Sequence, residues 1–410
     1  MENVFDTFEQ RGFIEQVTDE NQLREVFQKP VTCYIGFDPT APSLHLGSLV
    51  PIMALAHMQR AGHRPIAVVG GGTTLVGDPS GKTEMRRIMS REEIDKNAEG
   101  IKEQLSRFLD FSRGKALMVN NADWLTKLNY IEFLRDIGRH FSVNRMLAAE
   151  SYKARLKTGL SFIEFNYMLL QAYDFWYLYK HYECRLQMGG NDQWGNILAG
   201  VELTRRMEGA TIHCMTFPLI TTSGGIKMGK THKGAVWLDQ EMTPPYDYYQ
   251  YWINQDDMDI ERFLALFTFL PMDEVKRLGS LRGAEIRQAK EILAFEATKL
   301  CHGEEAAENA RNAARQLFGS DGAVNAESVP NFDLNSAELE KGMPAYLLFE
   351  KVGLCKSRGE ARRLISQGGG YVNHSRIETF DQIIDLNNVT NDSILLRGGK
   401  KRYLRINVQS

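Results

Sequence analysis

Residues 31–48 read VTCYIGFDPTAPSLHLGS. The β-branched and aromatic run at 31–37 predicts a short buried strand, and Asp38-Pro39-Thr40 ends it. We expect a helix from Ser48 to Ala61, followed by a second strand at 65–72, PIAVVGGG. Strand, loop, helix and strand in this order predict the start of a right-handed parallel α/β unit.

The rest of the chain repeats this alternation and then changes character. Helices are expected near 91–110 and 129–150, at 160–182 and at 191–207, with strands at 184–190 and 211–220. From Pro244 to about Leu317 the pattern is helical. Residues 321–342 are polar and aperiodic and contain Pro330, which indicates a linker before a separate small domain.

Composition excludes several classes of protein. The chain has 410 residues and a net charge of −3, which suits two or three domains of an ordinary globular protein. No apolar run approaches the ~18 residues of a membrane-spanning helix, and the acidic start lacks an apolar signal core. The five cysteines form no CxxC pair, so we expect free thiols in a reducing cytoplasm rather than disulfides or a zinc site.

Positive charge is concentrated near the end of the chain. Residues 351–410 contain 11 Lys or Arg and 5 Asp or Glu, whereas the rest of the chain is acidic. A basic segment on an acidic body predicts a polyanionic partner there.

The loop after the first strand carries groups suited to a phosphate. His45 can donate a hydrogen bond to a phosphate oxygen, and Gly47 lets a flat nucleobase approach the backbone. Free N–H groups and the helix dipole favour anions at such a strand-to-helix turn. A histidine before a helix is more often a cap or a surface residue, so this motif alone decides nothing.

A second glycine-rich loop, VGDPSGKT at 76–83, is similar to a Walker A motif. That motif requires glycine at position 76, where this chain has valine, so we reject a P-loop. The remaining segment, with Lys82, Arg86 and Arg87, could close over a polyphosphate or form a solvated charged turn.

Three further clusters are polar or flexible. Tyr167, Gln171 and Asp174, spaced i, i+4 and i+7, share one helix face and indicate either a polar pocket or a buried hydrogen-bond network. Glycines followed by Asp192, after the strand at 184–190, suit a ribose hydroxyl pair. Residues 223–231, SGGIKMGKT, form a flexible cationic loop, a type that is usually only surface.

In their order and spacing, these segments resemble the bacterial tyrosyl-tRNA synthetases, a family of class I aminoacyl-tRNA synthetases. The resemblance rests on YIGFDPTAPSLHLGS, GDPSGKTEMR, YMLLQAYDF, GGNDQWGNI, KMGKT and SRGEARRLISQGGGYVN, and it extends from about residue 31 onward. HLGS and KMGKT stand where the two family signatures belong. Ser48 replaces the usual histidine of the first signature and Gly229 the usual central serine of the second.

The resemblance implies an α/β fold with a Rossmann-type parallel-sheet catalytic domain, a helical middle domain and a small S4-like α+β C-terminal domain. The expected boundaries are 1–225 for the catalytic domain, with a helical insertion at about 120–180, and 226–320 for the signature loop and helical domain. The linker is expected at 321–342 and the S4-like RNA-binding domain at 343–410.

The resemblance also implies roles for the site residues. Tyrosine would be bound by Tyr34 and Asp174 at its phenol, by Asp78, Tyr167 and Gln171 at its ammonium, and by the nearby Gln187. The ATP site would comprise Asp38, Gly47, Gly190, Asp192, Gln193 and Lys230. The catalytic group would comprise Thr40, His45, Lys82, Arg86, Lys227, Lys230 and Thr231. ATP is expected as a substrate with Mg²⁺, and neither a tightly bound metal nor an organic cofactor is expected.

In the C-terminal segment, Ser357 and Glu360 read as a capping box at the start of a basic helix. The expected RNA-binding residues are Arg358, Arg362, Arg363, Lys400 and Lys401. The implied partners are L-tyrosine, ATP, tRNA(Tyr) and a second copy of the chain.

The implied activity is that of a tyrosine–tRNA ligase, which forms tyrosyl-adenylate and pyrophosphate and then transfers the tyrosyl group to tRNA. A related synthetase for tryptophan is disfavoured by Tyr34 and Asp174, because an indole has no hydroxyl. A catalytically silent RNA-binding protein on the same scaffold is disfavoured by the retained His45 and Lys230.

Overall fold

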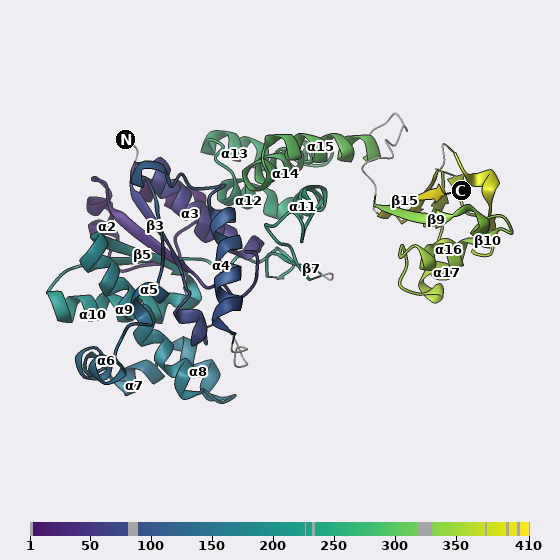
Figure 1. Cartoon of the computed structure of the whole chain (residues 1–410). Coiled ribbons are helices and arrows are strands. Elements are labelled where there is room, and N and C mark those ends of the chain that lie inside the picture. Colours follow the sequence, from purple (N-terminus) through teal and green to yellow (C-terminus); the bar gives the residue numbers. More distant parts are fainter. Residues whose placement is uncertain are drawn as a thin grey trace. The chain divides into compact units, whose positions relative to one another are not determined.

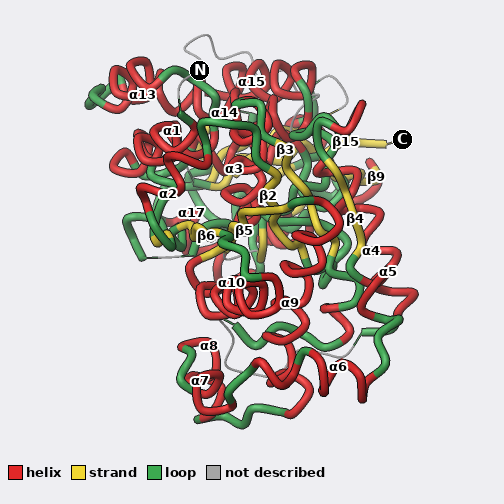
Figure 2. Tube along the Cα trace, turned by 90° about the vertical axis from the view of Figure 1, so that its left-hand side faces the viewer, coloured by secondary structure: helices red, strands yellow, loops and turns green. Residues whose placement is uncertain are grey.

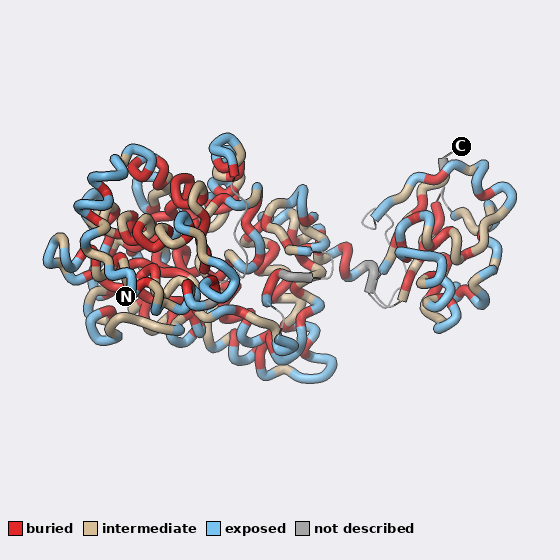
Figure 3. Tube along the Cα trace, turned by 90° about the horizontal axis from the view of Figure 1, so that it is seen from below, coloured by how far each residue is buried: buried red, intermediate tan, exposed pale blue. Residues whose placement is uncertain are grey.

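The structure is a computed structural model that describes residues 3–80, 89–225, 227–231, 234–318, 330–373, 375–390, 393–399 and 402–409. The chain divides into two compact units, Met1–Arg311 and Asn312–Ser410 (Figure 1). Buried residues form the interior of each unit (Figure 3).

The first unit is built on a six-stranded sheet. Its strands are β1 (Gln16–Val17), β2 (Thr32–Phe37), β3 (Arg64–Val69), β4 (Leu117–Asn120), β5 (Cys184–Gly190) and β6 (His213–Phe217). The strand order is β1-β6-β5-β2-β3-β4, with β1 antiparallel to β6 and the other pairs parallel. The predicted fold class, a Rossmann-type parallel sheet, is confirmed.

Strand order and register decide which side chains meet. The order reverses between β2 and β5, so the chain leaves these two strands in opposite directions and a crevice opens at their carboxyl ends. In the register of β2 and β5, Tyr34 lies opposite Gln187, so both side chains point to the same face of the sheet. On that face the Tyr34 ring contacts Phe175, with ring centroids 5.3 Å apart.

Helices of the first unit surround this sheet. They are α1 (Val4–Arg11), α2 (Glu20–Val26), α3 (Leu49–Arg60), α4 (Arg91–Leu105), α5 (Ala122–Leu125), α6 (Tyr130–Asp136), α7 (Val143–Leu147), α8 (Glu150–Leu156), α9 (Phe162–Tyr182) and α10 (Trp194–Glu208). The helices α9 and α10 pack against each other and against β5, whereas α3 packs with α1 and with α12 (Ile260–Phe267).

The long helix α9 begins at a reciprocal cap. Ser161 and Glu164 form a capping box, and the Glu164 carboxylate also pairs with the buried Arg155 guanidinium of α8 at 3.0 Å. The last turn of α9 ends at Glu183, which takes a left-handed conformation. The two caps define where α9 begins and ends, and its middle turns contain Tyr167, Gln171 and Asp174.

A helical part follows the sheet. It contains α11 (Pro245–Ile253), α12 (Ile260–Phe267), α13 (Met272–Gly279), α14 (Ile286–His302) and α15 (Glu304–Phe318). Before it lie the short strands β7 (Lys230–Thr231) and β8 (Gly234–Ala235). In Figures 1 and 2, α12–α14 and α6–α8 lie at opposite ends of the first unit.

The second unit contains a five-stranded sheet of order β12-β11-β14-β15-β9. Its elements are β9 (Asn331–Asn335), β10 (Met343–Pro344), α16 (Ala345–Lys351), α17 (Arg358–Ser366), β11 (Gly370–Val372), β12 (Ser375–Arg376), β13 (Ile383–Ile384), β14 (Ser393–Gly398) and β15 (Arg402–Gln409). β9 falls inside the segment expected to be a linker and pairs in parallel with β15.

The basic helix α17 starts as predicted at Ser357, whose hydroxyl accepts a hydrogen bond from the Glu360 amide at 3.2 Å. The Glu360 carboxylate accepts from the Lys356 amide rather than from the Ser357 amide, so the box is shifted by one residue. Gly368 follows the helix with φ of +76°, a conformation that favours glycine.

Candidate active site

Two cavities lie at the carboxyl edge of the first sheet, at the crevice between β2 and β5. The inner cavity has a volume of about 360 Å³ and extends down between α9 and the strands. The outer cavity has a volume of about 530 Å³ and is lined by the loop after β2 and by residues 217–229. Asp38, Thr40, His45 and Gly190 line both, so the two cavities share a wall.

At the closed end of the inner cavity lie the buried Tyr34 and Asp174. Asp174 accepts hydrogen bonds from Asn121 Nδ2 at 2.8 Å and from Trp124 Nε1 at 2.7 Å. Burial raises the pKa of Asp174 to about 7, although these two hydrogen bonds act in the opposite direction. Burial, helped by the Asp174 charge, raises the pKa of Tyr34 well above its usual value, so Tyr34 keeps its proton at neutral pH.

A hydrogen-bonded chain runs from this closed end to the shared wall. Asn121 Nδ2 also donates to Thr73 Oγ1 at 3.0 Å, and Thr73 Oγ1 donates to Asp38 Oδ1 at 2.8 Å. Tyr167 Oη donates to Asp38 Oδ2 at 3.0 Å. Asp38, Thr73 and Asn121 follow β2, β3 and β4, so three adjacent strand ends supply the chain.

Asp78 forms the other polar part of the inner cavity. It is buried and accepts hydrogen bonds from the Ser80 amide at 2.9 Å and from Gln193 Nε2 at 2.8 Å. Burial raises the pKa of Asp78 to about 6, and the Asp38 carboxylate also raises it. Three carboxylates therefore line one small cavity, an arrangement that attracts a cation.

Polar atoms in this cavity lack partners. Among the described residues, the buried Tyr34 Oη, Gln171 Oε1 and Gln187 Oε1 have no hydrogen-bond partner. Buried polar atoms are nearly always hydrogen-bonded, and leaving one unpaired costs about 1–3 kcal/mol. The inner cavity is therefore built for a polar, cationic ligand that supplies these hydrogen bonds.

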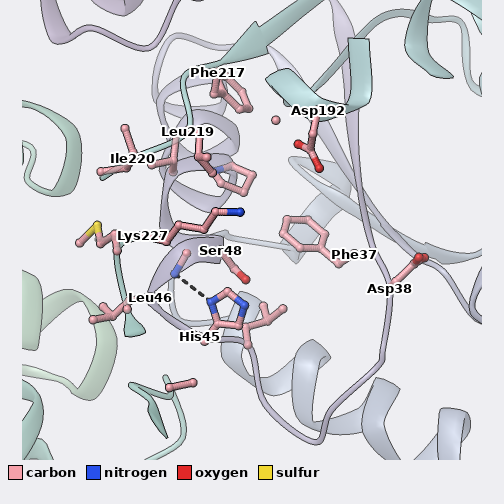
Figure 4. A pocket seen from close by; sticks show the side chains of 18 of the residues that line it. Phe37, Asp38, His45, Leu46, Ser48, Asp192, Phe217, Leu219, Ile220 and Lys227 are labelled. Atoms are coloured by element: carbon pink, nitrogen blue, oxygen red, sulfur yellow. Dashed lines mark hydrogen bonds between the residues drawn. The ribbon is translucent and has the colours of Figure 1, made fainter. Parts of the chain in front are cut away.

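His45 lines the outer cavity (Figure 4). Its Nδ1 accepts a hydrogen bond from the Gly47 amide at 2.9 Å. In a neutral ring the proton then sits on Nε2, the nitrogen that would donate to a phosphate oxygen. A Cβ on Gly47 would lie 2.6 Å from His45 Cε1, so any other residue here would push the histidine ring out of this position.

Across the outer cavity lie Asp192 and Lys227. Figure 4 shows the Lys227 side chain reaching into the cavity between Asp192 and His45. Gly190 leaves room for Asp192, because a Cβ on Gly190 would lie 2.6 Å from Asp192 Oδ1. A cation, a carboxylate and a histidine around one space suit a ligand that carries both hydroxyls and phosphates.

The first signature segment is hydrogen-bonded to residues 236–238 and lies close to Gly229 of the second signature. Leu46 N donates to Val236 O at 3.0 Å, and Leu238 N donates to Leu44 O at 2.9 Å. Between these bonds, His45 and Trp237 form a β-bridge, with their ring centroids 6.2 Å apart. Gly229 has φ of +80°, and a Cβ there would lie 3.0 Å from Leu46 Cβ.

The structure brings most of the predicted residues together. All six residues expected to bind tyrosine line the inner cavity: Tyr34, Asp78, Tyr167, Gln171, Asp174 and Gln187. The outer cavity is lined by Asp38, Thr40, His45, Gly47, Gly190, Asp192 and Lys227. Gln193, expected in the ATP site, lies instead on the inner cavity beside Asp78.

Other predicted residues cannot be placed in this way. Lys82, Arg86, Lys400 and Lys401 lie outside the described residues. Lys230 and Thr231 form β7, but their side chains are not described. Arg358, Arg362 and Arg363 lie on α17 in the second unit.

Four residues of the site are missing from the sequence interpretation: Thr73, Asn121, Trp124 and Trp237. Asn121 and Trp124 follow β4, a four-residue strand that the sequence pattern did not reveal. The usable signal was the pair Asn120-Asn121 directly after the apolar run 116–119.

Within the described ranges, no group of three or more His, Cys, Asp or Glu side chains could hold a metal ion. A search of the same ranges finds no helix long and apolar enough to span a membrane. The five cysteines are buried and unpaired.

Comparison with known proteins extends these observations over the whole chain. Residues 26–319 match the family described as tRNA synthetases class I (W and Y), and residues 322–406 match the tyrosine–tRNA ligase SYY-like C-terminal domain. The chain is 59% identical to the tyrosine–tRNA ligase of Syntrophus aciditrophicus over 100% of both chains. It is 56% identical to that of Caldanaerobacter subterraneus, covering 99% of this chain and 100% of the relative.

A solved structure is similar as well. A C-terminally truncated mitochondrial tyrosyl-tRNA synthetase of Aspergillus nidulans superposes with a TM-score of 0.70 at 32% identity. The superposition covers 78% of this chain and 95% of that chain.

Proposed function

The chain belongs to the class I tRNA synthetases of the tryptophan and tyrosine type and is a tyrosine–tRNA ligase, and we propose that its inner cavity binds L-tyrosine and its outer cavity binds ATP. One observation carries this assignment of the cavities. Six residues that the sequence predicts for tyrosine line one cavity, three of its buried polar atoms lack partners, and it shares a wall with the cavity that contains His45.

Tyrosine fits the inner cavity in one orientation. Its phenol would donate to Asp174 and accept from Tyr34 at the closed end, and its ammonium would lie among Asp78, Tyr167 and Gln171. Phenylalanine has no hydroxyl, so it would leave the buried Tyr34 Oη without a partner and would donate no hydrogen bond to Asp174; we expect it to bind more weakly. The substrate carboxylate then points to the shared wall and the outer cavity.

ATP would lie across the carboxyl ends of β2 and β5. Asp192 and Gly190 would receive the ribose, Gly47 the adenine, and His45 and Thr40 the phosphates. Lys227, Lys230, Lys82 and Arg86 would neutralise the departing pyrophosphate. Mg²⁺ would be bound mainly by the phosphates, since this ion usually keeps few protein ligands.

The reaction needs alignment and charge neutralisation rather than a covalent enzyme intermediate. A carboxylate oxygen of tyrosine attacks the α-phosphorus, the bond to the β-phosphate oxygen breaks, and pyrophosphate leaves with its charge. The 3′-terminal ribose hydroxyl of tRNA then attacks the tyrosyl carbonyl and releases AMP. Contacts that strengthen as charge moves onto pyrophosphate lower the barrier.

The experiment that tests this proposal is ATP–pyrophosphate exchange driven by tyrosine, tryptophan or phenylalanine. Exchange with tyrosine alone is expected. Exchange driven better by tryptophan would support the tryptophan alternative, and no exchange with any of the three would support a silent RNA-binding protein.

Substitution of a residue that would contact the phosphates distinguishes an effect on adenylate formation from an effect on tyrosine binding. We expect His45→Ala and Lys230→Ala to slow adenylate formation while the Kd of tyrosine stays nearly unchanged. Unchanged pre-steady-state rates would contradict these roles.

We further propose that the second unit binds tRNA. Its family match and the excess of Lys and Arg over 351–410 support this role. A chain ending before residue 330, which removes β9 together with the sheet it belongs to, should retain exchange and lose most tRNA charging. Equal loss of both reactions would contradict a dedicated RNA-binding role.

A homodimer is proposed from exposed apolar side chains. Of the twelve large hydrophobic residues exposed on the described parts of the chain, seven fall between residues 130 and 163: Tyr130, Ile131, Leu134, Val143, Leu156, Phe162 and Ile163. Such a concentration is typical of an interaction site. Light scattering should give twice the chain mass, and Phe162→Asp should shift it toward the monomer.

We also propose a cytoplasmic location. Five buried free thiols suit a reducing compartment, and ATP and tRNA are available there. Cell fractionation tests this location.

A further inference from the structure

The sheet in the second unit has one face that packs into the core and one face that does not. Val372, Leu396 and Leu404 are buried together with the apolar side chains of α16 and α17. Side chains alternate between the two faces along a strand. The neighbours of these core residues, Tyr371 in β11, Arg397 in β14 and Tyr403 in β15, therefore point to the opposite face. This opposite face is half-buried rather than buried along the three central strands.

Arginine and tyrosine alternate across this face. In the strand register Arg376 lies opposite Tyr371, Tyr371 opposite Arg397, and Arg397 opposite Tyr403. Arg405 follows two residues after Tyr403 on the same face. We name these five residues the Tyr–Arg row.

Within the row, a planar guanidinium is stacked on an aromatic ring. The Arg397 guanidinium carbon lies 3.5 Å from the Tyr371 ring centroid and 6.0 Å from the Tyr403 ring centroid. A guanidinium at 3.5 Å from a ring centroid is stacked on that ring. The Arg397 guanidinium, and with it a positive charge, therefore lies next to two aromatic rings.

The charge of the row is not neutralised within the described part of the chain. There, Arg376, Arg397 and Arg405 form no ion pair with Asp or Glu, whereas Arg358 pairs with Glu350 at 2.9 Å and Arg402 pairs with Glu360 at 3.1 Å. On α17, the Arg362 guanidinium lies over the Tyr346 ring at 4.2 Å. Arg362 and Arg363 of α17 likewise form no ion pair within the described ranges, so both the sheet face and the helix keep uncompensated charge, and the sheet face combines it with stacked aromatic rings.

This chemistry is that of a site for unpaired nucleotides. Bases stack on aromatic rings and on guanidinium planes, and phosphates pair with arginine. A double-stranded stem, whose bases are already stacked, would use only the charges. We propose that the Tyr–Arg row docks an unpaired stretch of the tRNA, with bases on the layered rings and phosphates at Arg376 and Arg405. This inference rests on the proposed RNA-binding role of the second unit and adds the surface and the mode of contact.

The test uses the full chain and a tRNA(Tyr) transcript, with binding measured by fluorescence anisotropy over a range of salt. Arg397→Lys keeps the charge but removes the planar group, and Tyr403→Leu removes a ring. Each should weaken binding by about 5- to 100-fold without changing the slope of log K against log salt. Arg405→Gln should weaken binding and reduce that slope by about 1.

Controls separate stacking from misfolding. Tyr403→Phe keeps the ring and should bind like the unmodified chain. Tyrosine-dependent ATP–pyrophosphate exchange reports only on the first unit and should be unchanged in every variant.

The proposal is overturned if Arg397→Lys and Tyr403→Leu bind tRNA normally while Arg363→Gln, on α17, does not, because the RNA would then lie on the helix. It is also overturned if Tyr403→Phe weakens binding as much as Tyr403→Leu. Loss of tRNA binding on removal of residues 330–410 would still support the RNA-binding role in either case.

Discussion

Asn121 Nδ2 donates a hydrogen bond of 2.8 Å to Asp174, and the same nitrogen lies 3.0 Å from Thr73 Oγ1. Asn121 thus connects the carboxylate at the closed end of the inner cavity to Asp38 at the wall shared with the outer cavity, through Thr73. Asp174, which we expect to bind the phenol, is therefore held by a hydrogen-bond network that extends to the nucleotide site.

The first prediction concerns this network. Asn121→Ala removes a hydrogen bond to a buried carboxylate, which contributes about 1.5–3 kcal/mol. The KM for tyrosine in ATP–pyrophosphate exchange should rise by about 10- to 100-fold, and discrimination against phenylalanine should decrease. Asn254→Ala, the same change on the exposed end of α11, should leave both quantities unchanged. A normal KM in Asn121→Ala would contradict the role of the network.

The second prediction concerns pH. The pKa of Asp78 is raised to about 6, so this carboxylate is charged above that pH and becomes neutral as the pH falls through it. An ammonium attracted by Asp78 is then held less strongly, and the KM for tyrosine should rise as the pH falls below about 6.

A desamino analogue supplies the control for pH. 3-(4-Hydroxyphenyl)propionate keeps the phenol and the carboxylate, so titration of Asp174 affects it as it affects tyrosine. Its inhibition constant should therefore change less than the KM of tyrosine between pH 7 and 5. If the inhibition constant of the analogue and the KM of tyrosine changed equally with pH, the ammonium would not lie beside Asp78.

The third prediction concerns Trp237, which forms a β-bridge with His45 and contacts its ring. We expect Trp237 to hold His45 in position. An aromatic pair contributes about 0.5–1.5 kcal/mol, so Trp237→Leu should lower the rate of adenylate formation by about 2- to 10-fold. The Kd of tyrosine should stay constant, and Trp237→Phe should recover most of the rate. Equal loss in the two variants would show that the ring contact is irrelevant.

The fourth prediction concerns Gly229, where the family usually has serine. Gly229 has φ of +80°, and a Cβ would lie 3.3 Å from Gly47 N. A non-glycine residue in this conformation costs about 1–2 kcal/mol, so Gly229→Ser should lower the rate of adenylate formation by about 5- to 30-fold unless the loop changes its path. Gly225→Ser is the matched control, because φ there is also positive, at +75°, but nothing lies within 4 Å of a Cβ; it should slow adenylate formation less than Gly229→Ser, and the difference between them measures the contact with Leu46 and Gly47. A faster Gly229→Ser enzyme would contradict this reading of the loop.

Much of the first unit could be predicted from local patterns. Largely apolar runs that end in glycine or aspartate indicated β2, β3 and β5, and the polar face of α9 indicated Tyr167, Gln171 and Asp174. These signals work because the parallel topology brings all carboxyl ends to one edge. Two or three strong motifs therefore indicate the edge of the sheet at which the site lies, though not every residue in it.

The remainder depends on contacts that a local pattern does not encode. β4 has only four residues, and so short an apolar run does not distinguish a strand from a loop, so the pattern does not predict Asn121 and Trp124 after it. Gln193 is next to Asp192 in sequence, yet the turn Asn191–Gln193 directs Gln193 to Asp78 in the other cavity. β9 reads as a polar linker because it is an edge strand with one apolar side, and only its pairing with β15 makes it part of a sheet.

The most direct test of the account is a crystal structure with tyrosine and a non-hydrolysable ATP analogue bound together. We expect the phenol oxygen within hydrogen-bond distance of Tyr34 and Asp174, the α-phosphate next to the tyrosine carboxylate, and His45 in contact with the phosphates. Tyrosine bound anywhere outside the inner cavity, or an analogue whose phosphates lie away from His45, would contradict it.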